Sequence, residues 1–301
     1  MHAIALVLGF LAFGVALRLS GRLPASTAKL LSGWVINVAL PAAAISSVHN
    51  VDPREDWWLA AAMPWIGIVV AAAVVLPLCR AKGWSRQRAG ALLLLTGWGS
   101  TAFVGLPMIE ALAGQQWLSL GLVVDLFGSD LSLATVGIAV AAVAARGALR
   151  WRPVVMRVIT FPPLLALLFA LATDHLARPG WITGIVESLA VTLTPVALMA
   201  VGFQLRFNRI GERMGPLAVG LGVRLLVVPA AIALIYAALG DLGDPVVRVA
   251  VLQMSMPAMV GAGIIAIEHD LEPDLVALVV GLGIPLSLLT GWAWWTAVGA
   301  A

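Results

Sequence analysis

Two aspartates and one glutamine stand in stretches that are otherwise apolar and uncharged. Asp125 and Asp130 are five residues apart in "VVDLFGSDLSLATVG", and Gln253 lies in "VLQMSMPAMVGAG". Apolar surroundings favour the neutral form of an acid, so such an acid can take up and release a proton. A buried amide can donate a hydrogen bond to a carboxylate or accept one from a cation. All three residues are therefore candidates for ligand binding or for proton coupling.

The helical positions of the two acids differ. On an ideal α-helix, residues five apart are separated by about 140°, so Asp125 and Asp130 are predicted to lie on different faces. Asp125 shares its face with Gly121, Ser129 and Ser132. Either acid has a structural alternative, in which neighbouring Ser and Thr hydroxyls tie it in place.

Two apolar segments carry their own helix breakers. The first is "LLLLTGWGSTAFVGLPMIEALAG", residues 92–114, and the second is "VLQMSMPAMVGAGIIAIEHD", residues 251–270. Glycine and proline interrupt a helix, and the free amides at the start of the following half-helix carry partial positive charge that can hold an anion. The alternative is a kink without a ligand. The breakers are Gly97, Gly99, Gly105 and Pro107 in the first segment and Pro257, Gly261 and Gly263 in the second.

The composition sets the environment of these segments. The chain has 301 residues, is 61% hydrophobic and only 11% charged, and its mean hydropathy is +1.03. Residues 57–79, 89–109, 249–267 and 275–301 contain no charge. Because about 20 apolar residues cross a bilayer, the chain is predicted to be an integral membrane protein with several spans. The single cysteine, Cys79, excludes an internal disulfide.

Ten spans are predicted, and basic residues flank them unevenly. Most Lys and Arg residues lie in odd-numbered loops, so these loops are predicted to be cytoplasmic and both termini extracytoplasmic. This topology explains the pI of 9.7 without nucleic acid as a partner. The acidic ninth loop breaks the pattern. The predicted spans are 3–18, 31–49, 57–79, 89–112, 119–145, 155–173, 184–205, 215–239, 248–267 and 275–298, and the odd-loop basic residues are Arg18, Arg22, Lys29, Arg80, Lys82, Arg86, Arg88, Arg146, Arg150, Arg152, Arg157, Arg206, Arg209 and Arg213.

The two halves of the chain are predicted to be inverted repeats, residues 1–150 and 151–301, because five spans in each half insert with opposite orientation. Pro41 and Pro195 occupy the second and seventh spans. The breaker-containing fourth and ninth spans also correspond. Interrupted spans at matching positions of two halves indicate the binding site of a transporter.

On these motifs the chain resembles the auxin efflux carrier family, which includes plant auxin carriers and bacterial malonate and malate carriers. The resemblance covers nearly the whole chain, and the order of the pieces carries it. They are "INVALPAAAISS", "STAFVGLPMIEALAG", "DLFGSDLSLATVG", "FPPLLALLFAL", "LTPVALMAVGFQL" and "MPAMVGAGIIAIEHDLEPDLVALVVGLGIPLS". The sodium–bile acid symporters are a more distant likeness.

The resemblance implies an all-α fold of ten helices, with broken helices 4 and 9 crossing and scaffold and transport domains drawn from both repeats. Pro257 matches the crossover proline of the ninth helix. Plant carriers have Pro-Asn where this chain has Gly99 and Ser100, so auxin is not the expected substrate. Asp130 resembles a position that holds a substrate-facing tyrosine in auxin carriers.

These observations predict a secondary transporter of a small organic anion, such as a carboxylate or dicarboxylate, in the cytoplasmic (inner) membrane. The predicted substrate-binding residues are Gly99, Ser100, Thr101, Asp130, Gln253, Pro257, Ala258 and Met259, and the predicted coupling residues are Asp125 and Asp130. The anion is expected between the amides around Ser100 and Thr101 and those around Ala258 and Met259. Neither a metal nor an organic cofactor is predicted, while H⁺ or Na⁺ coupling, elevator or rocking motion, and homodimerisation stay open.

Several other residues have two interpretations. Asn37 is predicted to bind backbone near Pro41. Arg224 is expected to pair with an acid, to balance an anionic substrate or to snorkel to the interface. Glu110 and Glu268 are expected to meet water at span ends, as are His49 and Asn50. The alternative functions are a sodium-coupled symporter of the bile-acid type or a channel. The sequence contains none of the motifs GxGD, HExxH and GxSxG, so an enzyme is not predicted.

Overall fold

The computed structural model describes residues 2–24, 26–47, 56–145, 156, 160–173, 179–204, 213–239 and 243–299. Within these ranges the regular elements are helices, and one isolated antiparallel bridge joins Gly99 to Ala258. His49, Asn50 and His175, together with the loop arginines Arg54, Arg146, Arg150, Arg152, Arg157, Arg178, Arg206 and Arg209, lie outside the described residues.

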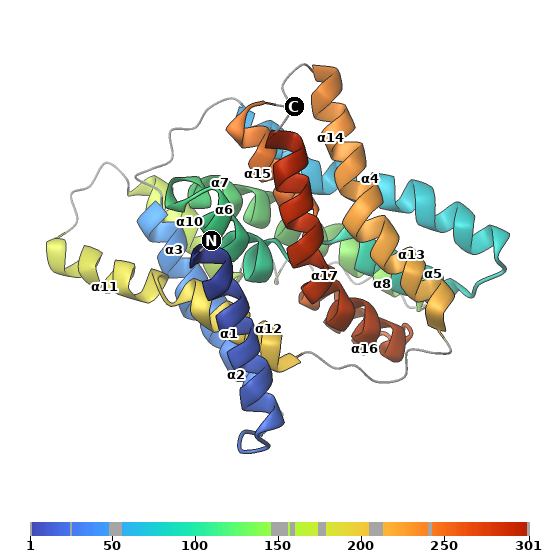
Figure 1. Ribbon diagram of the computed structural model, residues 1–301, viewed down its shortest axis with the longest axis horizontal. Helices are drawn as coiled ribbons and strands as arrows, with labels where there is room; N and C mark the ends of the chain where they lie inside the picture. The colour runs from blue at the N-terminus through green and yellow to red at the C-terminus, as the bar shows by residue number, and fades with distance from the viewer. Residues whose placement is uncertain are drawn as a thin grey trace. The chain divides into compact units, whose positions relative to one another are not determined.

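Helices occupy the described parts of the predicted spans (Figure 1). In the first half of the chain they are α1 (His2–Leu19), α2 (Thr27–Trp34), η1 (Val35–Ala39), α3 (Leu40–Ser47), α4 (Asp56–Ala81), α5 (Arg86–Gly97), η3 (Thr101–Gly105), α6 (Leu106–Leu112), η4 (Gln115–Trp117), α7 (Leu118–Val123), η5 (Val124–Asp130), η6 (Leu133–Gly137) and α8 (Ile138–Ala144). In the second half they are α10 (Pro162–Ala172), α11 (Gly180–Ala190), α12 (Leu193–Gln204), α13 (Met214–Gly222), η8 (Val223–Val227), α14 (Val228–Leu239), α15 (Pro245–Met254), α16 (Val260–Glu268) and α17 (Pro273–Gly299).

Among the described residues, six helical stretches are long and apolar enough to cross a membrane: Thr27–Ser46, Trp57–Ala81, Gln115–Ala144, Gly180–Phe203, Met214–Leu239 and Pro273–Gly299. Shorter apolar helices cover 6–19, 101–112, 162–172 and 245–254. A multi-pass membrane protein is therefore supported, whereas the count of ten spans and the inverted repeat stay predictions.

Among the residues that the structure describes, three π-helical turns end two residues before a proline. Proline has no amide hydrogen for the carbonyl four residues earlier and clashes with it, so the preceding turn widens to the i→i+5 pattern. Two further π-helical segments, η5 and η6, have no such proline. The three pairs are Val35–Ala39 with Pro41, Thr101–Gly105 with Pro107, and Val223–Val227 with Pro229.

The chain divides into two compact units, each built from segments of both halves. Unit 1 comprises residues 1–54, 102–122 and 155–205, and unit 2 comprises residues 55–101, 123–154 and 206–301. In unit 1, α1 packs closely on α12 through small residues. A Cβ on Gly202 would stand 2.1 Å from the Leu11 carbonyl oxygen, and one on Gly14 would stand 2.3 Å from that of Met199. Such small-residue contacts are typical of membrane helices.

In unit 2 a continuous apolar core packs α5, which precedes the first break, and α16, which follows the second break, against α4, α8, α13 and α17. The buried face of α5 is its "LLLL" run, residues 92–95. Gly90 brings α5 close to α8, since a Cβ there would lie 2.3 Å from the Cβ of Ala144. This core fixes the ends of α5 and α16, and those ends form the site described below.

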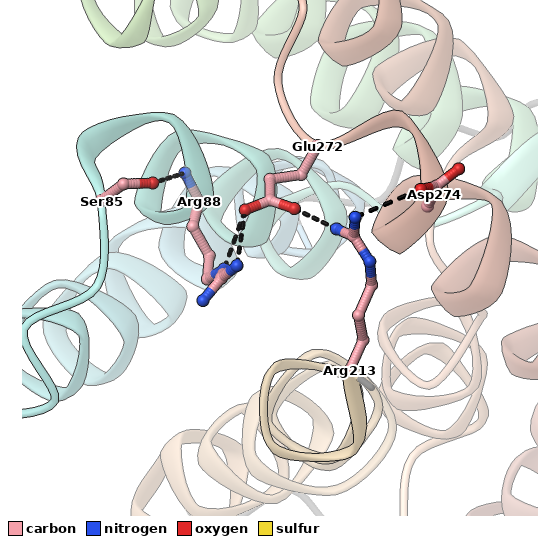
Figure 2. Close-up of polar contacts among 5 residues, drawn as sticks. All are labelled: Ser85, Arg88, Arg213, Glu272 and Asp274. Carbon is pink, nitrogen blue, oxygen red and sulfur yellow. Dashed lines mark hydrogen bonds and ion pairs between the residues drawn. The ribbon is translucent and has the colours of Figure 1, made fainter. Parts of the chain in front are cut away.

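An ion-pair network links the N-terminal ends of α5, α13 and α17 in unit 2 (Figure 2). Glu272 lies between Arg88, at 2.8 Å, and Arg213, which also contacts Asp274 at 3.1 Å. Ser85 caps α5 by accepting a hydrogen bond from the Arg88 amide. Glu272 of the acidic ninth loop therefore contacts Arg88 and Arg213, which were assigned to the basic third and seventh loops. These ion pairs give its carboxylate two partners of opposite charge.

Candidate functional site

The two interrupted helices of unit 2 end facing each other, and the short linkers after them pair. α5 ends at Gly97 and α15 at Met254. The Ser100 amide donates to the Pro257 carbonyl at 2.8 Å, and the Met259 amide donates to the Trp98 carbonyl at 2.9 Å. These two bonds satisfy backbone groups that would be costly to leave unpaired in a membrane. The predicted interruptions are therefore present, and we call the paired linkers, residues 98–100 and 257–259, the crossover.

A buried guanidinium closes the carbonyl ends of both broken helices. Arg224, in the π-helical turn η8, is 1% exposed. Its Nε donates to the Met256 carbonyl at 2.7 Å, Nη2 to the Met254 carbonyl at 2.8 Å, and Nη1 to the Thr96 carbonyl at 3.2 Å. The expectations of an acidic partner and of snorkelling were wrong. The positive charge instead meets the partial negative charge of two helix C-termini.

Glycine is required beside this guanidinium. A Cβ on Gly99 would lie 2.1 Å from Nη2 and 2.8 Å from Cζ of Arg224. At Gly97 the nearest atom to a built Cβ is Cγ1 of Ile68 at 3.5 Å, an ordinary contact. Gly99 thus serves the close approach of the arginine as well as the helix break.

A buried acid contacts the end of the same linker. Thr101 Oγ1 donates to Asp125 Oδ1 at 2.5 Å, and both residues are fully buried. The prediction that Asp125 and Asp130 occupy different faces assumed an ideal α-helix. Both lie in the π-helical segment η5, where the backbone bonds residues five apart, so the angle of an ideal α-helix does not apply and the placement on different faces stays a prediction. Asp125 is buried and Asp130 half-buried.

Trp98 ties the crossover to the helix of Asp125. Its indole Nε1 donates to Ser132 Oγ at 2.9 Å, and Ser132 Oγ donates to the Ser129 carbonyl at 3.0 Å. The Trp98 carbonyl meanwhile accepts the Met259 amide. Sequence reasoning missed Trp98, although its position between Gly97 and Gly99 could have drawn attention to it.

The second half of the ninth helix begins without a side-chain cap. α16 starts at Val260, and its N-cap residue Met259 offers no side-chain hydrogen bond. The first amides of a helix have no intrahelical acceptor, so those of Val260, Gly261 and Ala262 point out of the helix start. Met259, Val260 and Gly261 are half-buried. This end therefore offers partially positive donors next to the crossover.

The predicted binding residues are concentrated at this place. Gly99, Ser100, Thr101, Gln253, Pro257 and Ala258 are buried in or beside the crossover, and Met259 is half-buried. The amides of Ser100 and Met259 already donate across the bridge, and that of Thr101 donates to the Gly99 carbonyl. These three amides therefore already have carbonyl acceptors. The amides that follow Met259 belong to the uncapped first turn of α16.

Two peripheral predictions have clear outcomes. Asn37 donates to the Gly33 carbonyl at 2.8 Å, which confirms a backbone-binding role. In unit 1, Glu110 accepts a hydrogen bond from Thr194 Oγ1 at 2.5 Å and is half-buried, so the expectation that it simply meets water was wrong. Glu268 is exposed, as predicted.

Comparison with known proteins found matches that cover most of the chain. The family model described as "Membrane transport protein" matches residues 1–157 and 148–295. The chain is also similar to a protein described as an "Uncharacterized transporter" from Methanothermobacter thermautotrophicus. The two are 26% identical over 287 residues, which cover 94% of this chain and 93% of that protein.

Proposed function

Since the chain belongs to the membrane transport protein family, the family of the auxin efflux carriers, we propose that it is a secondary transporter of a small organic anion. The substrate class is a carboxylate or dicarboxylate, and it crosses the cytoplasmic membrane by alternating access at the crossover. Family and relative support a transport protein rather than an enzyme. The substrate class and the mechanism are our proposal.

The observation that carries the anion class is the uncapped start of α16. Its first amides are fixed by the crossover, because the Met259 amide is bonded to Trp98. Helix N-termini with free amides are common sites for carboxylate and phosphate groups. Arg224 adds a full positive charge beside the same bridge. Partial and full charges of one sign at one place favour an anion over a cation.

Asp125 is our candidate for proton coupling, and Asp130 is the second candidate. A buried acid within a predicted span is a functional candidate by default. Asp125 is linked through Thr101 to the end of the crossover, so a change in its protonation alters a group that touches the proposed site. Asp130 lies at the last position of the same π-helical segment.

The proposal can be tested by removing one amide without disturbing the helix. Val260 is the first residue of α16, where proline is well tolerated. Met259 has φ −68° and ψ 128°, the extended conformation required before proline. Val260→Pro should therefore keep α16 and lose one donor. The matched variant Val260→Ala loses the side chain and keeps the donor.

The measurement is the thermal stability of the purified protein against a panel of mono- and dicarboxylates, followed by uptake of any stabilising anion into proteoliposomes. We expect at least one carboxylate to stabilise the wild type by mass action. Val260→Pro should lower the affinity for that anion about tenfold or more, since a hydrogen bond to a charged group contributes roughly 1.5–3 kcal/mol. Val260→Ala should lower the affinity less.

A second proline variant controls for a general effect of the substitution. Gly180→Pro places proline at the first residue of α11 in unit 1, where a Cβ meets nothing within 4 Å. It should leave anion binding unchanged. Stabilisation by carboxylates that is equal in Val260→Pro and the wild type would exclude the α16 amides. A wild type that responds to no carboxylate would refute the proposed substrate class.

A further inference from the structure

The three carbonyls around Arg224 form the type of site that carriers with broken helices use for a coupling cation. In such carriers, unwound carbonyls and the C-terminal ends of half-helices coordinate Na⁺ or H⁺. Here the carbonyls belong to Thr96 in the last turn of α5, Met254 at the end of α15, and Met256 in the linker. Helix C-termini carry partial negative charge, so they require a cation or other donors when buried.

We propose that the Arg224 guanidinium is a resident cation that takes the place of a dissociable metal ion at the crossover. The side chain satisfies three carbonyls, from α5, from α15 and from the segment after α15, at 2.7–3.2 Å, and it is 1% exposed. A planar fork of donors suits several acceptors at once. The charge that Na⁺ would supply at this place is therefore carried by a side chain that cannot dissociate.

The neighbouring residues are consistent with a site shaped for this side chain. Gly99 leaves the room that Nη2 and Cζ occupy. The widened turn of η8 ends two residues before Pro229, and Arg224 lies in that turn. Helix widening shifts the direction of side chains, and π-helical turns are frequent at functional sites.

A specific consequence follows for ion dependence. If Arg224 holds the carbonyls, neither Na⁺ nor K⁺ is needed there, and the proposed anion transport draws on protons or on the anion gradient alone. This inference deepens the proposed function, but its central test does not require a known substrate. The carbonyl site exists in the protein whether or not the transported anion is a carboxylate.

The test is chemical rescue of a cavity. Arg224→Ala removes the guanidinium and leaves the three carbonyls unpaired, so we expect the melting temperature of the purified protein to fall by about 5–10 °C. Guanidinium chloride at low millimolar concentration should restore part of this loss, with stabilisation that rises with concentration. Urea is a neutral molecule of similar shape and should not restore this stability. Choline chloride at equal ionic strength should not restore it either. Na⁺ or K⁺ is expected to give weaker rescue.

Controls separate this role from the general loss of an arginine. Arg88→Ala removes an arginine whose side chain is 30% exposed and faces Glu272, and guanidinium should not rescue it. The conservative variant Arg224→Lys keeps the charge and should lose less stability than Arg224→Ala. If Arg224→Ala cannot be purified, Arg224→Lys and the wild type still decide the question through their response to sodium.

Three results would overturn the inference. The first is Arg224→Ala with unchanged stability. The second is equal rescue by urea and guanidinium, which would mean that cavity filling rather than charge matters. The third is a wild type stabilised by Na⁺ or K⁺ but not by choline. A failure to respond to any carboxylate would instead refute the proposed anion transport and leave the rescue result standing.

Discussion

Replacing Gly99 with alanine should cost far more stability than the same change at Gly97, two residues earlier in the same segment. At Gly99 the new methyl group would lie 2.1 Å from Nη2 of Arg224, well inside contact distance. The guanidinium cannot simply swing away, because three carbonyls hold it. At Gly97 the nearest atom is 3.5 Å away.

The magnitude follows from these distances. Overpacking a tight site costs about 1–3 kcal/mol, and weakening one hydrogen bond from a charged donor costs about 1.5–3 kcal/mol. We therefore expect Gly99→Ala to lose about 2.5–6 kcal/mol, or roughly 4–10 °C in melting temperature. Gly97→Ala should stay within about 1 kcal/mol of the wild type, since alanine is the better helix former.

Thermal unfolding of the detergent-purified variants, followed by tryptophan fluorescence, measures both changes. A double-mutant cycle identifies the cause: once Arg224→Ala has removed the guanidinium, adding Gly99→Ala should cost almost nothing. Equal losses at Gly97 and Gly99, or a Gly99→Ala penalty that persists in the Arg224→Ala background, would refute the steric argument. The penalty would then come from the backbone of the crossover.

Three further variants test other contacts. Thr101→Val keeps the shape of the side chain but leaves Asp125 without this donor, so stability measured by thermal unfolding should fall by about 1–3 kcal/mol. Glu272→Gln should cost about 1 kcal/mol or less, and thermal unfolding at rising ionic strength should show the difference from wild type shrinking. Gly202→Ala should lower the melting temperature because its Cβ would meet a carbonyl oxygen at 2.1 Å, whereas Gly9→Ala, with nothing within 4 Å, should not.

Helix positions and helix breaks could be predicted from sequence because each leaves a local pattern. Charge-free runs of suitable length gave bounds within a few residues of α4 and α17. The predicted span 215–239 likewise matches the helical stretch Met214–Leu239, which comprises α13, η8 and α14. The clustering of Gly97, Gly99 and Pro257 gave both interruptions. These features follow from residue type and spacing along one stretch of chain.

The role of Arg224 could not be predicted, because its partners are backbone carbonyls. A carbonyl carries no residue signature, and Thr96 and Met254 are far from Arg224 in the sequence. A search for a partner among side chains therefore leads to acids, which is the expectation that failed. The direction of the Asp125 side chain was likewise hidden, because the π-helical segment η5 lacks a proline that would announce it.

The charges at the crossover lead to a final prediction, on the pH dependence of anion binding. Arg224 contributes a fixed positive charge against Gly99, and Asp125 accepts a hydrogen bond from Thr101 at the end of the same linker. Ionised Asp125 offsets the arginine, whereas protonated Asp125 leaves its charge available to the anion. Binding of the anion should therefore favour proton uptake, and the affinity for the anion should rise as the pH falls.

The stabilisation by a carboxylate, measured at an acidic and at a near-neutral pH, should be larger at the acidic pH. Asp125→Asn, which mimics the protonated acid, should bind tightly at both. A pH dependence that survives in Asp125→Asn would assign the proton to another group, with Asp130 as the next residue to replace.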